Sequence, residues 1–438
     1  MFKFTLRGVV FHLFKQLLLL TFCIAFLLAT IIYFAVGRAS ALPNNNFSRS
    51  ASLKLNTTTP ILSENAKRYR TDHYIIHTEL PQDRVIPIGR HVDQMFEQYE
   101  KRFKGLIASQ HRPMPIYLFD SESDYIRFLA KYNIHAHNSG GMFVYKQNLK
   151  CLALWIGDKP MRDVKAVLQH EGFHQFTWNY IGNNLPVWMN EGLAQYFEDA
   201  VITDGTLRTG LADINRTKLV KLMVRSNHFL PFPAIMDMSH DDWSKILSSD
   251  PDQASRLYAQ AWSMVYFLIH HDDGRNASNV NKYLAALNSG DNPKDSFEEI
   301  FSSDRGHLQR QWQRFALTMR NDPVSEAAER MQYLSVALRH FQSQNITIPR
   351  NIDKLQHLMR RFGIEVSWTS NNTTQTITAN DPRLYTFKRN GLPADFILLA
   401  SPRDNMPPRI LAKGLTPEPM LIWHQTPTGQ ITPDIIYR

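Results

Sequence analysis

The sequence predicts an α+β protein in which one transmembrane helix precedes two folded units. Three observations carry this prediction. The chain has 438 residues, of which 43% are hydrophobic and 20% are charged, a composition that can build sizeable cores in more than one domain. Strand-like and helix-like runs alternate early, and a long helical stretch follows them. Near the N-terminus, about twenty residues without a charge form one apolar run.

The apolar run covers residues 17–36, LLLLTFCIAFLLATIIYFAV, and is long enough to cross a bilayer as a helix. Basic residues precede the run and only Arg38 follows it closely. The positive-inside rule therefore predicts that residues 1–16 are a basic cytoplasmic tail and that the bulk of the chain is extracytoplasmic. We expect a single-pass, membrane-anchored protein, periplasmic if the source is a Gram-negative bacterium.

A cleaved signal peptide is the alternative interpretation of this N-terminus. Ala39, Ser40 and Ala41 would suit a cleavage site, and the protein would then be secreted. The apolar run is longer than a typical signal core, which favours the signal anchor. Residues 37–70 are rich in Asn, Ser and Thr and lack hydrophobic periodicity, so we expect a flexible linker there.

The charge and the cysteine count exclude two other classes of protein. The net charge is +9, but the basic residues are scattered and form no stripe with stacking aromatics, so we expect no nucleic-acid partner. The two cysteines, Cys23 and Cys151, cannot build a disulfide framework. Cys151 lies in an apolar, strand-like run and is expected to be a buried, inert thiol.

The larger unit is expected at residues 71–322 and begins with strands. The run HYIIHTEL and Met114–Phe119 have the composition of strands, and Val92–Phe103 between them carries apolar residues at helical spacing. Ser121 is a typical N-cap for a helix after the second strand. Two extended runs then flank the polar turn Lys146–Asn148, which predicts a β-hairpin.

The rest of the larger unit, from Met161 to about Phe315, is expected to be mainly helical. Turn-forming residues predict breaks at Gly182–Pro186, Pro231–Pro233 and Ser289–Pro293.

A separate, small α+β unit is expected at residues 325–438. Helices are predicted at Glu326–Gln342 and from about Asn351 to just before Gly363. Short β-like runs follow, among them IEVSW, FILLAS and PMLIWH. We find no catalytic motif in this unit.

The informative motif is the H-E-x-x-H pattern at residues 170–174. On a helix, His170 and His174 lie one turn apart on the same face, so both imidazoles can reach one metal ion. Glu171 stands beside them, where a carboxylate can accept a proton from an activated water instead of binding the metal. The pattern predicts a zinc site, and the alternative is a histidine pair satisfied within the core.

A catalytic zinc needs a third protein ligand, and Glu191 is the candidate. It lies seventeen residues beyond His174, after a turn-forming segment, at the start of a predicted second helix that would fold back along the first. Glu198 is the reserve candidate for this ligand. Gln195, one turn after Glu191, is expected to orient a ligand by a hydrogen bond.

These residues resemble the gluzincin zinc metallopeptidases, the thermolysin-like superfamily. The similarity is greatest to the aminopeptidase N branch, whose second helix carries a Trp-Leu-Asn-Glu-Gly-Phe-Ala pattern, here Trp188–Ala194 with the sequence WMNEGLA. The chain also resembles uncharacterised secreted bacterial domains with the same H-E-x-x-H motif. The resemblance is specific around residues 167–198, extends loosely over about 71–320, and does not reach the C-terminal unit. It implies a gluzincin-like fold with Zn²⁺ on His170, His174 and Glu191.

The resemblance adds two further positions. Tyr258 lies where the branch has a tyrosine that stabilises the transition state, and a helix-packing tyrosine is the alternative. Residues 140–144, GGMFV, occupy the place of the branch's Gly-Ala-Met-Glu-Asn edge strand. Phe143 replaces the glutamate that holds a free substrate amine, which argues against strict aminopeptidase activity. An edge strand able to pair with an extended peptide remains.

We therefore expect a zinc metallopeptidase that hydrolyses peptide bonds, with Glu171 as general base and Tyr258 as electrophilic partner. Its partners would be a peptide or protein substrate and the membrane; the sequence does not indicate an oligomeric state. Two alternatives stay open: an inactive metal-binding adaptor for peptide or cell-envelope material, and a zinc hydrolase of a non-peptide amide or ester. The cluster at residues 270–273, HHDD, is expected to cap the end of a helix, with its polar side chains in solvent, and not to bind metal.

Overall fold

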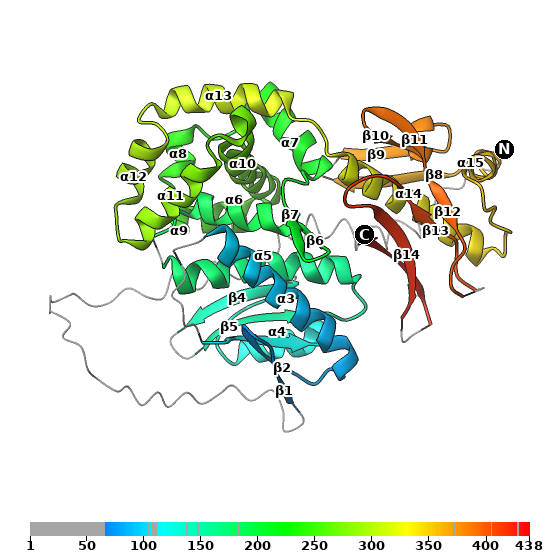
Figure 1. Cartoon of the computed structure of the whole chain (residues 1–438), viewed down its shortest axis with the longest axis horizontal. Coiled ribbons are helices and arrows are strands. Elements are labelled where there is room, and N and C mark those ends of the chain that lie inside the picture. The colour runs from blue at the N-terminus through cyan, green and yellow to red at the C-terminus, as the bar shows by residue number, and fades with distance from the viewer. Residues whose placement is uncertain are drawn as a thin grey trace.

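The computed structural model describes residues 66–438, except 104–105, 107–111, 137–138, 147–148, 183, 371–372, 404 and 427–428. Helices and strands are both abundant, which confirms the α+β class (Figure 1). In this part of the chain no helix combines the length and the apolar character that a membrane span requires. The predicted span at residues 17–36, the tail before it and nearly all of the linker lie outside the described residues.

A five-stranded mixed sheet forms the base of the first unit. Its strand order is β1-β2-β3-β5-β4, with the three central strands parallel and the two outer strands antiparallel to their neighbours. The predicted hairpin is confirmed, because β4 pairs with β5, and β4 lies at the edge of the sheet. The strands are β1 (Lys67–Arg70), β2 (Tyr74–Thr78), β3 (Met114–Phe119), β4 (Gly141–Lys146) and β5 (Leu149–Trp155).

The first strand corrects the expected linker at residues 37–70. Lys67–Arg70 form β1 and pair with β2 in an antiparallel ladder. The sequence KRYR has no apolar alternation, and only Tyr69 packs against the core. The ladder with β2, and not a hydrophobic pattern, therefore defines this strand.

Alternating side chains of β3 separate the two faces of the sheet. Ile116 and Leu118 belong to the large core beneath helices α3 (Gln82–Arg102) and α5 (Met161–Tyr180). Tyr117 and Phe119 point to the opposite face, where α4 (Glu122–Ala130) covers a smaller core. As predicted, Ser121 caps α4, since its side chain accepts a hydrogen bond of 3.1 Å from the backbone of Asp124.

Helix α3 is longer than expected. It begins at Gln82, whereas the sequence predicted a start at Val92, and it continues through Pro87. Val85 and Ile88 are fully buried in the large core, and this burial offsets the hydrogen bond that a proline removes from a helix.

The predicted helical stretch is confirmed, with its three breaks. Helix α10 packs along α6, and in Figure 1 these helices lie on the side of α5 away from the sheet. A short β6–β7 hairpin within the stretch was not predicted. The elements are α6 (Val187–Glu198), β6 (Val201–Thr203), β7 (Thr206–Arg208), α7 (Ile214–Arg225), α8 (Phe232–Met236), α9 (His240–Ser249), α10 (Pro251–His270), η1 (His271–Gly274), α11 (Ala277–Asn288), α12 (Pro293–Ile300) and α13 (Arg305–Thr318).

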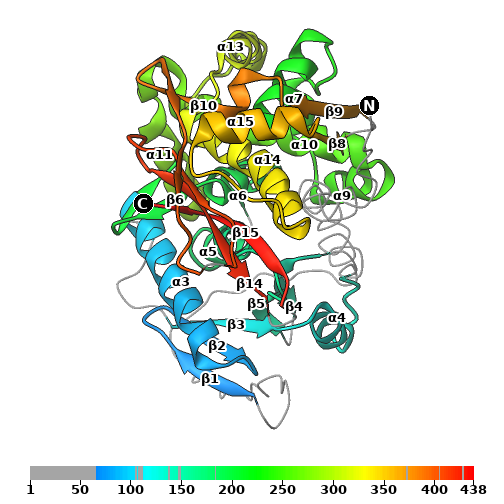
Figure 2. The same cartoon turned by 90° about the vertical axis from the view of Figure 1, so that its right-hand side faces the viewer.

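The C-terminal unit has a hydrophobic core of its own, which begins at Val324, whereas the large core ends at Met319. Strands β12 to β15 form a four-stranded antiparallel sheet beside α14, and β15 approaches α5 of the first unit (Figure 2). The elements are α14 (Pro323–Ser343), α15 (Ile352–Arg361), β8 (Glu365–Ser370), β9 (Thr373–Thr378), η2 (Pro382–Tyr385), β10 (Thr386–Arg389), β11 (Leu392–Asp395), β12 (Ile397–Leu399), β13 (Arg409–Leu411), β14 (Pro419–Gln425) and β15 (Ile431–Tyr437).

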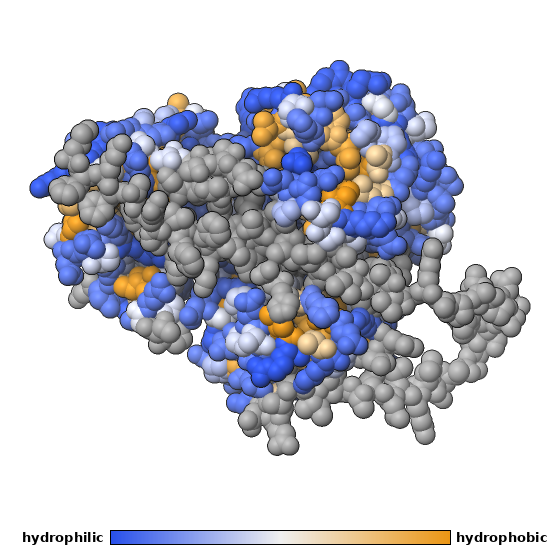
Figure 3. Space-filling view, turned by 180° about the vertical axis from the view of Figure 1, so that it is seen from behind, coloured by the Kyte–Doolittle hydropathy of each residue, from blue (hydrophilic) through white to orange (hydrophobic). Residues whose placement is uncertain are grey.

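The face of the molecule opposite to Figure 1 is mostly hydrophilic, with hydrophobic residues in separate patches (Figure 3).

Candidate metal centre

Helix α5 is held firmly between the sheet and α6. Gly141 of β4 lies so close to α5 that an added Cβ atom would be 2.9 Å from a methyl group of Val167. The Gln175 side chain donates a hydrogen bond of 3.1 Å to the backbone oxygen of Pro115 in β3. The helix ends where Gly182, at a φ of +79°, donates its N–H to the carbonyl of Thr177. These contacts fix the position of the H-E-x-x-H motif on α5.

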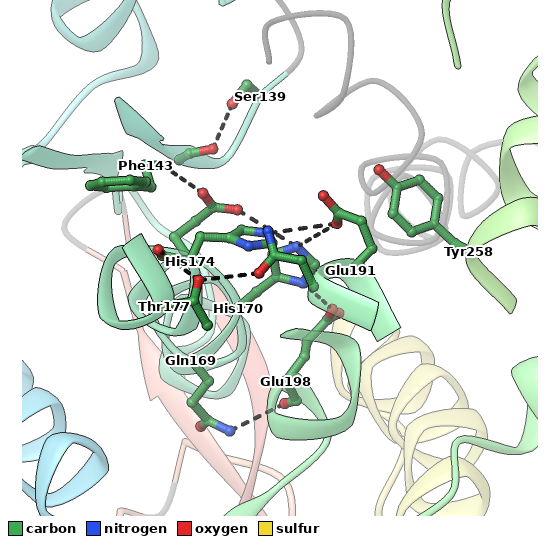
Figure 4. Close-up of polar contacts among 12 residues, drawn as sticks. Ser139, Phe143, Gln169, His170, His174, Thr177, Glu191, Glu198 and Tyr258 are labelled. Atoms are coloured by element: carbon green, nitrogen blue, oxygen red, sulfur yellow. Dashed lines mark hydrogen bonds and ion pairs between the residues drawn. The ribbon is translucent and has the colours of Figure 1, made fainter. Parts of the chain in front are cut away.

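Helix α6 brings Glu191 to the two histidines, as the sequence predicted. The Nε2 atoms of His170 and His174 lie 3.7 Å and 3.5 Å from the same oxygen, Oε2 of Glu191 (Figure 4). Ligand atoms that share a tetrahedral zinc ion are about 3.3–3.6 Å apart, given zinc bonds of about 2.0–2.2 Å. Both distances are close to this range, so one ion could contact Glu191 together with either imidazole.

Glu171 is also close to the two imidazoles, since ligand atoms of His170, Glu171 and His174 lie within 4.8 Å of one another. Distance alone would allow either glutamate as the third ligand. The two carboxylates differ in their other contacts. Oε2 of Glu171 accepts a hydrogen bond of 2.5 Å from the backbone N–H of Phe143 in β4, whereas Glu191 approaches both imidazoles with a single oxygen. Of the two carboxylates, Glu191 therefore has the geometry expected of a third ligand.

The remaining oxygen of Glu171, Oε1, is buried and has no hydrogen-bond partner among the described residues. It lies 3.8 Å from Nε2 of His170, so it borders the place where a metal ion would sit. A carboxylate that is anchored through one oxygen and free at the other is oriented for proton transfer at the free oxygen. Sequence reasoning missed the anchor, because every residue type except proline can supply a backbone N–H.

Glu198 orients His170 from the other side of the ring. Its Oε2 lies 2.9 Å from Nδ1 of His170, which leaves Nε2 to face Glu191. The sequence predicted this role for Gln195, and that prediction is wrong. Gln195, Glu198 and Glu191 share one face of α6, and the crossing of α5 over α6 brings Glu198 to His170. Oε1 of Gln195 has no hydrogen-bond partner among the described residues.

Hydrogen bonds between α5 and α6 maintain this crossing. The Gln169 side chain donates to the backbone oxygens of Phe197 at 2.5 Å and Ala200 at 2.8 Å, at the C-terminal end of α6. Thr177, one turn from His174, donates to the side-chain oxygen of Asn190 at 3.2 Å. Both ends of the metal-facing segment of α5 are thus tied to α6.

The electrostatics of the site favour a cation. Burial alone would lower the pKa of His170, but the nearby carboxylates of Glu191 and Glu198 raise it to about 10. Burial alone would raise the pKa of Glu191, but the attraction of its carboxylate to the imidazoles of His174 and His170 lowers it. Three carboxylates, Glu171, Glu191 and Glu198, surround two imidazoles in this buried region. A divalent cation at the meeting point would compensate this negative charge, so the donor set fits zinc.

Tyr258 lies on α10 and is buried. Its hydroxyl accepts a hydrogen bond of 3.5 Å from the indole of Trp243, and Figure 4 places the ring beyond Glu191, with the hydroxyl on the side of the carboxylate. Its role in stabilising a transition state stays a prediction. His240, at the start of α9, was not predicted. Burial lowers its pKa, and the charges of Glu191 and His174 also act on it, so His240 is within electrostatic reach of the site.

The other candidates do not join this centre. Nε2 of His270 lies 3.0 Å from the hydroxyl of Tyr196, and among the described residues the cluster at 270–273 forms no group that could hold a metal ion. Cys151 is fully buried, and burial raises the pKa of its thiol, as expected of an inert cysteine.

Comparisons with known proteins add one match. Residues 164–288 match a family model described as "Protein of unknown function (DUF1570)". The matched segment runs from α5 into α11 and contains His170, Glu171, His174, Glu191 and Tyr258. No curated protein matches the chain.

Proposed function

We propose that the protein is a zinc-dependent metallopeptidase of the gluzincin type, anchored in a membrane by residues 17–36 and acting outside the cytoplasm. The observation that carries the proposal is the placement of Glu191 Oε2 within 3.7 Å of both imidazole Nε2 atoms, beside Oε1 of Glu171, which accepts no hydrogen bond from any described residue. A histidine pair that served only packing and ion pairing would leave unexplained the buried Oε1 of Glu171, which has no hydrogen-bond partner among the described residues.

His170, His174 and Glu191 would hold the zinc ion. When bound, zinc would polarise the scissile carbonyl and lower the pKa of water at the site. Oε1 of Glu171 would then accept the proton of the attacking water and pass it to the leaving amine. The hydrogen bond from Phe143 keeps the Glu171 carboxylate in place during both transfers. Burial raises the pKa of Glu171 toward neutral pH. A group that both accepts and donates a proton is most effective when its pKa lies near the working pH.

The free edge of β4 favours a peptide as the substrate. In the antiparallel ladder with β5, the backbone groups of Met142 and Val144 point toward β5, so those of Phe143 and Tyr145 point to the open edge. Glu171 occupies the N–H of Phe143, which leaves the Phe143 carbonyl and the backbone groups of Tyr145 for a peptide. An extended peptide that pairs with this edge would lie next to Glu171. Phe143 offers no carboxylate to a free amino terminus, so we propose an endopeptidase preference.

The test is incubation of the zinc-loaded, full-length protein with a mixture of denatured proteins, followed by detection of new amino termini by mass spectrometry. The proposal predicts new termini within substrate sequences and their loss after chelation of zinc. Bound zinc without new termini would favour a metal-binding adaptor instead, and cleavage of ester or acetyl-amide probes alone would favour a non-peptide hydrolase.

A further inference from the structure

Aromatic side chains of β4 and α5 meet beside the candidate metal centre. The side chains before and after Phe143 point to the smaller core beneath α4, so Phe143 and Tyr145 face α5. Tyr145 contacts Trp178 of α5, with ring centres 3.6 Å apart. Nζ of Lys150, the partner of Tyr145 in β5, lies 4.7 Å from the centre of the Tyr145 ring. Contacts with two elements therefore hold the Tyr145 ring in place.

Trp178 lies on the metal-facing side of α5. It follows His174 by one helical turn and Glu171 by two, so these side chains share one face of the helix. Helix α5 and strand β4 run side by side in the same direction. Contacts join Phe143 to Glu171 and, further along both elements, Tyr145 to Trp178. The pair of Tyr145 and Trp178 therefore adjoins the proposed general base.

The fold does not use these aromatic rings as core. Phe143, Tyr145 and Trp178 are each half-buried, and none belongs to a hydrophobic core formed by the described residues. Apolar surface that gathers beside a few placed polar groups is typical of a ligand-binding surface. Tyr and Trp rings also offer a large contact area at a low cost in conformational entropy.

The open edge of β4 determines which part of a peptide meets this surface. The N–H and the carbonyl of Tyr145 point to that edge. A peptide residue that pairs with Tyr145 has its side chain on the same face of the sheet, which is the face of Trp178. Phe143, about 7 Å earlier along the strand, bonds the carboxylate of Glu171. The paired residue is therefore about two residues from the position beside Glu171.

We propose that Tyr145 and Trp178, with Phe143 beside them, form a specificity subsite for an aromatic or large aliphatic side chain of the peptide substrate. This side chain belongs to a residue within about three positions of the cleaved bond. The inference rests on the proposed function, because it assigns a substrate preference to the same site. The position of the Tyr145 backbone at the sheet edge favours a peptide over other apolar ligands.

A positional scan of short peptides tests the subsite. The probes are blocked peptides of Ser and Ala that carry one Phe, at a different position in each, and the parent peptide without Phe. The zinc-loaded, full-length protein should cleave peptides with Phe at one fixed distance from the cleaved bond with a kcat/KM at least about tenfold above that of the parent.

Variants of Trp178 separate specificity from a structural role. Trp178→Ala should lose the preference for Phe but cleave the parent within about twofold of the wild-type rate, whereas a structural defect would slow both reactions. Trp178→Phe should restore most of the preference. Phe362→Ala removes an aromatic residue of the C-terminal unit that is 42% exposed, and this control should retain the preference. Loss of parent cleavage in Trp178→Ala, or a preference that this variant retains, would overturn the subsite.

Binding measurements separate the subsite from the proposed peptidase activity. The same peptides are titrated by calorimetry into the zinc-loaded Glu171→Gln protein, with and without Trp178→Ala. Tighter binding of one Phe peptide than of the parent, lost with Trp178→Ala, would support the subsite even if the wild type cleaved nothing, a result that would refute only the peptidase. Binding that ignores the position of Phe overturns the subsite. Absence of any binding at about 10 mM, a concentration that reveals even weak complexes, also overturns it.

Discussion

The Glu198 carboxylate lies 2.9 Å from Nδ1 of His170, while Nε2 of the same ring faces Glu191 at 3.7 Å. The imidazole is thus held between two carboxylates of one helix, α6, and its ligand nitrogen is directed at the candidate metal position. A carboxylate on the second nitrogen fixes the tautomer and raises the basicity of a metal-binding histidine. Glu198 is therefore a positioning residue of the site.

Replacement of Glu198 by Ala should weaken zinc affinity by about 10–100-fold, the usual effect of removing such a partner. Glu198→Gln should cause a smaller loss, because an amide oxygen can still accept a hydrogen bond from Nδ1. Competition with a chromophoric chelator measures both affinities. Equal affinities in the wild type and Glu198→Ala would show that His170 needs no support from this side chain.

Replacement of Glu171 by Gln should leave zinc in the protein and abolish most of the hydrolysis. The amide retains an oxygen for the Phe143 N–H but cannot accept a proton, so the rate should fall by about 10²–10⁴-fold. The measurement is the appearance of new amino termini, with zinc content determined on the same sample. Substantial activity in zinc-loaded Glu171→Gln would contradict the general-base role.

The two glycines that flank the metal ligands should respond to alanine in opposite ways. An added Cβ atom at Gly192 would lie 2.5 Å from the backbone oxygen of Ala261 in α10, whereas at Gly172 it would meet no atom within 4 Å. Gly192→Ala should therefore lower the free energy of unfolding by roughly 1–3 kcal/mol through overpacking, and reduce zinc content by displacing Glu191.

Gly172→Ala is the matched control in α5. Because alanine favours a helix more than glycine does, this variant should be more stable than the wild type by roughly 0.5–1 kcal/mol. Urea unfolding followed by tryptophan fluorescence measures both variants. If Gly192→Ala were as stable as Gly172→Ala, the close packing of α6 on α10 would be refuted.

Stability should fall with pH below neutrality partly because of His91. Burial, with a smaller contribution from Lys165, lowers the pKa of His91 from 6.5 to about 3. The unfolded chain therefore binds a proton between these pH values and the folded chain does not, so the contribution of His91 is present above pH 6.5 and is lost as the pH falls. Between pH 7 and pH 5 the wild type should lose about 2 kcal/mol more than His91→Gln. Equal losses in urea unfolding at the two pH values would show that His91 is accessible to protons in the folded state.

The sequence predicts which residues of α5 and α6 come together at the site. The spacing of His170 and His174 requires a helix for both rings to share one face, and Pro186 marks where the next helix begins with Glu191 close behind. The edge position of the β4–β5 hairpin also agrees with expectation.

The sequence does not predict which groups support the site. Residues 191, 195 and 198 occupy one face of α6, and only the angle at which α5 crosses α6 selects Glu198 as the partner of His170. The backbone N–H of Phe143 leaves no mark in the sequence. The early start of helix α3 was not predicted, because the burial of Val85 outweighs the local effect of Pro87. Strand β1 was not predicted either, because its pairing with β2 outweighs the polar sequence KRYR.

The most direct test of the metal centre is elemental analysis of the purified full-length protein and of its Glu191→Ala and His174→Ala variants. The three-ligand site predicts about one zinc per wild-type chain and little or none in either variant, because a structural or catalytic zinc site depends on all its protein ligands. Zinc at an equal level in the wild type and in Glu191→Ala would contradict the site, and so would its absence from the wild type after purification with zinc supplied.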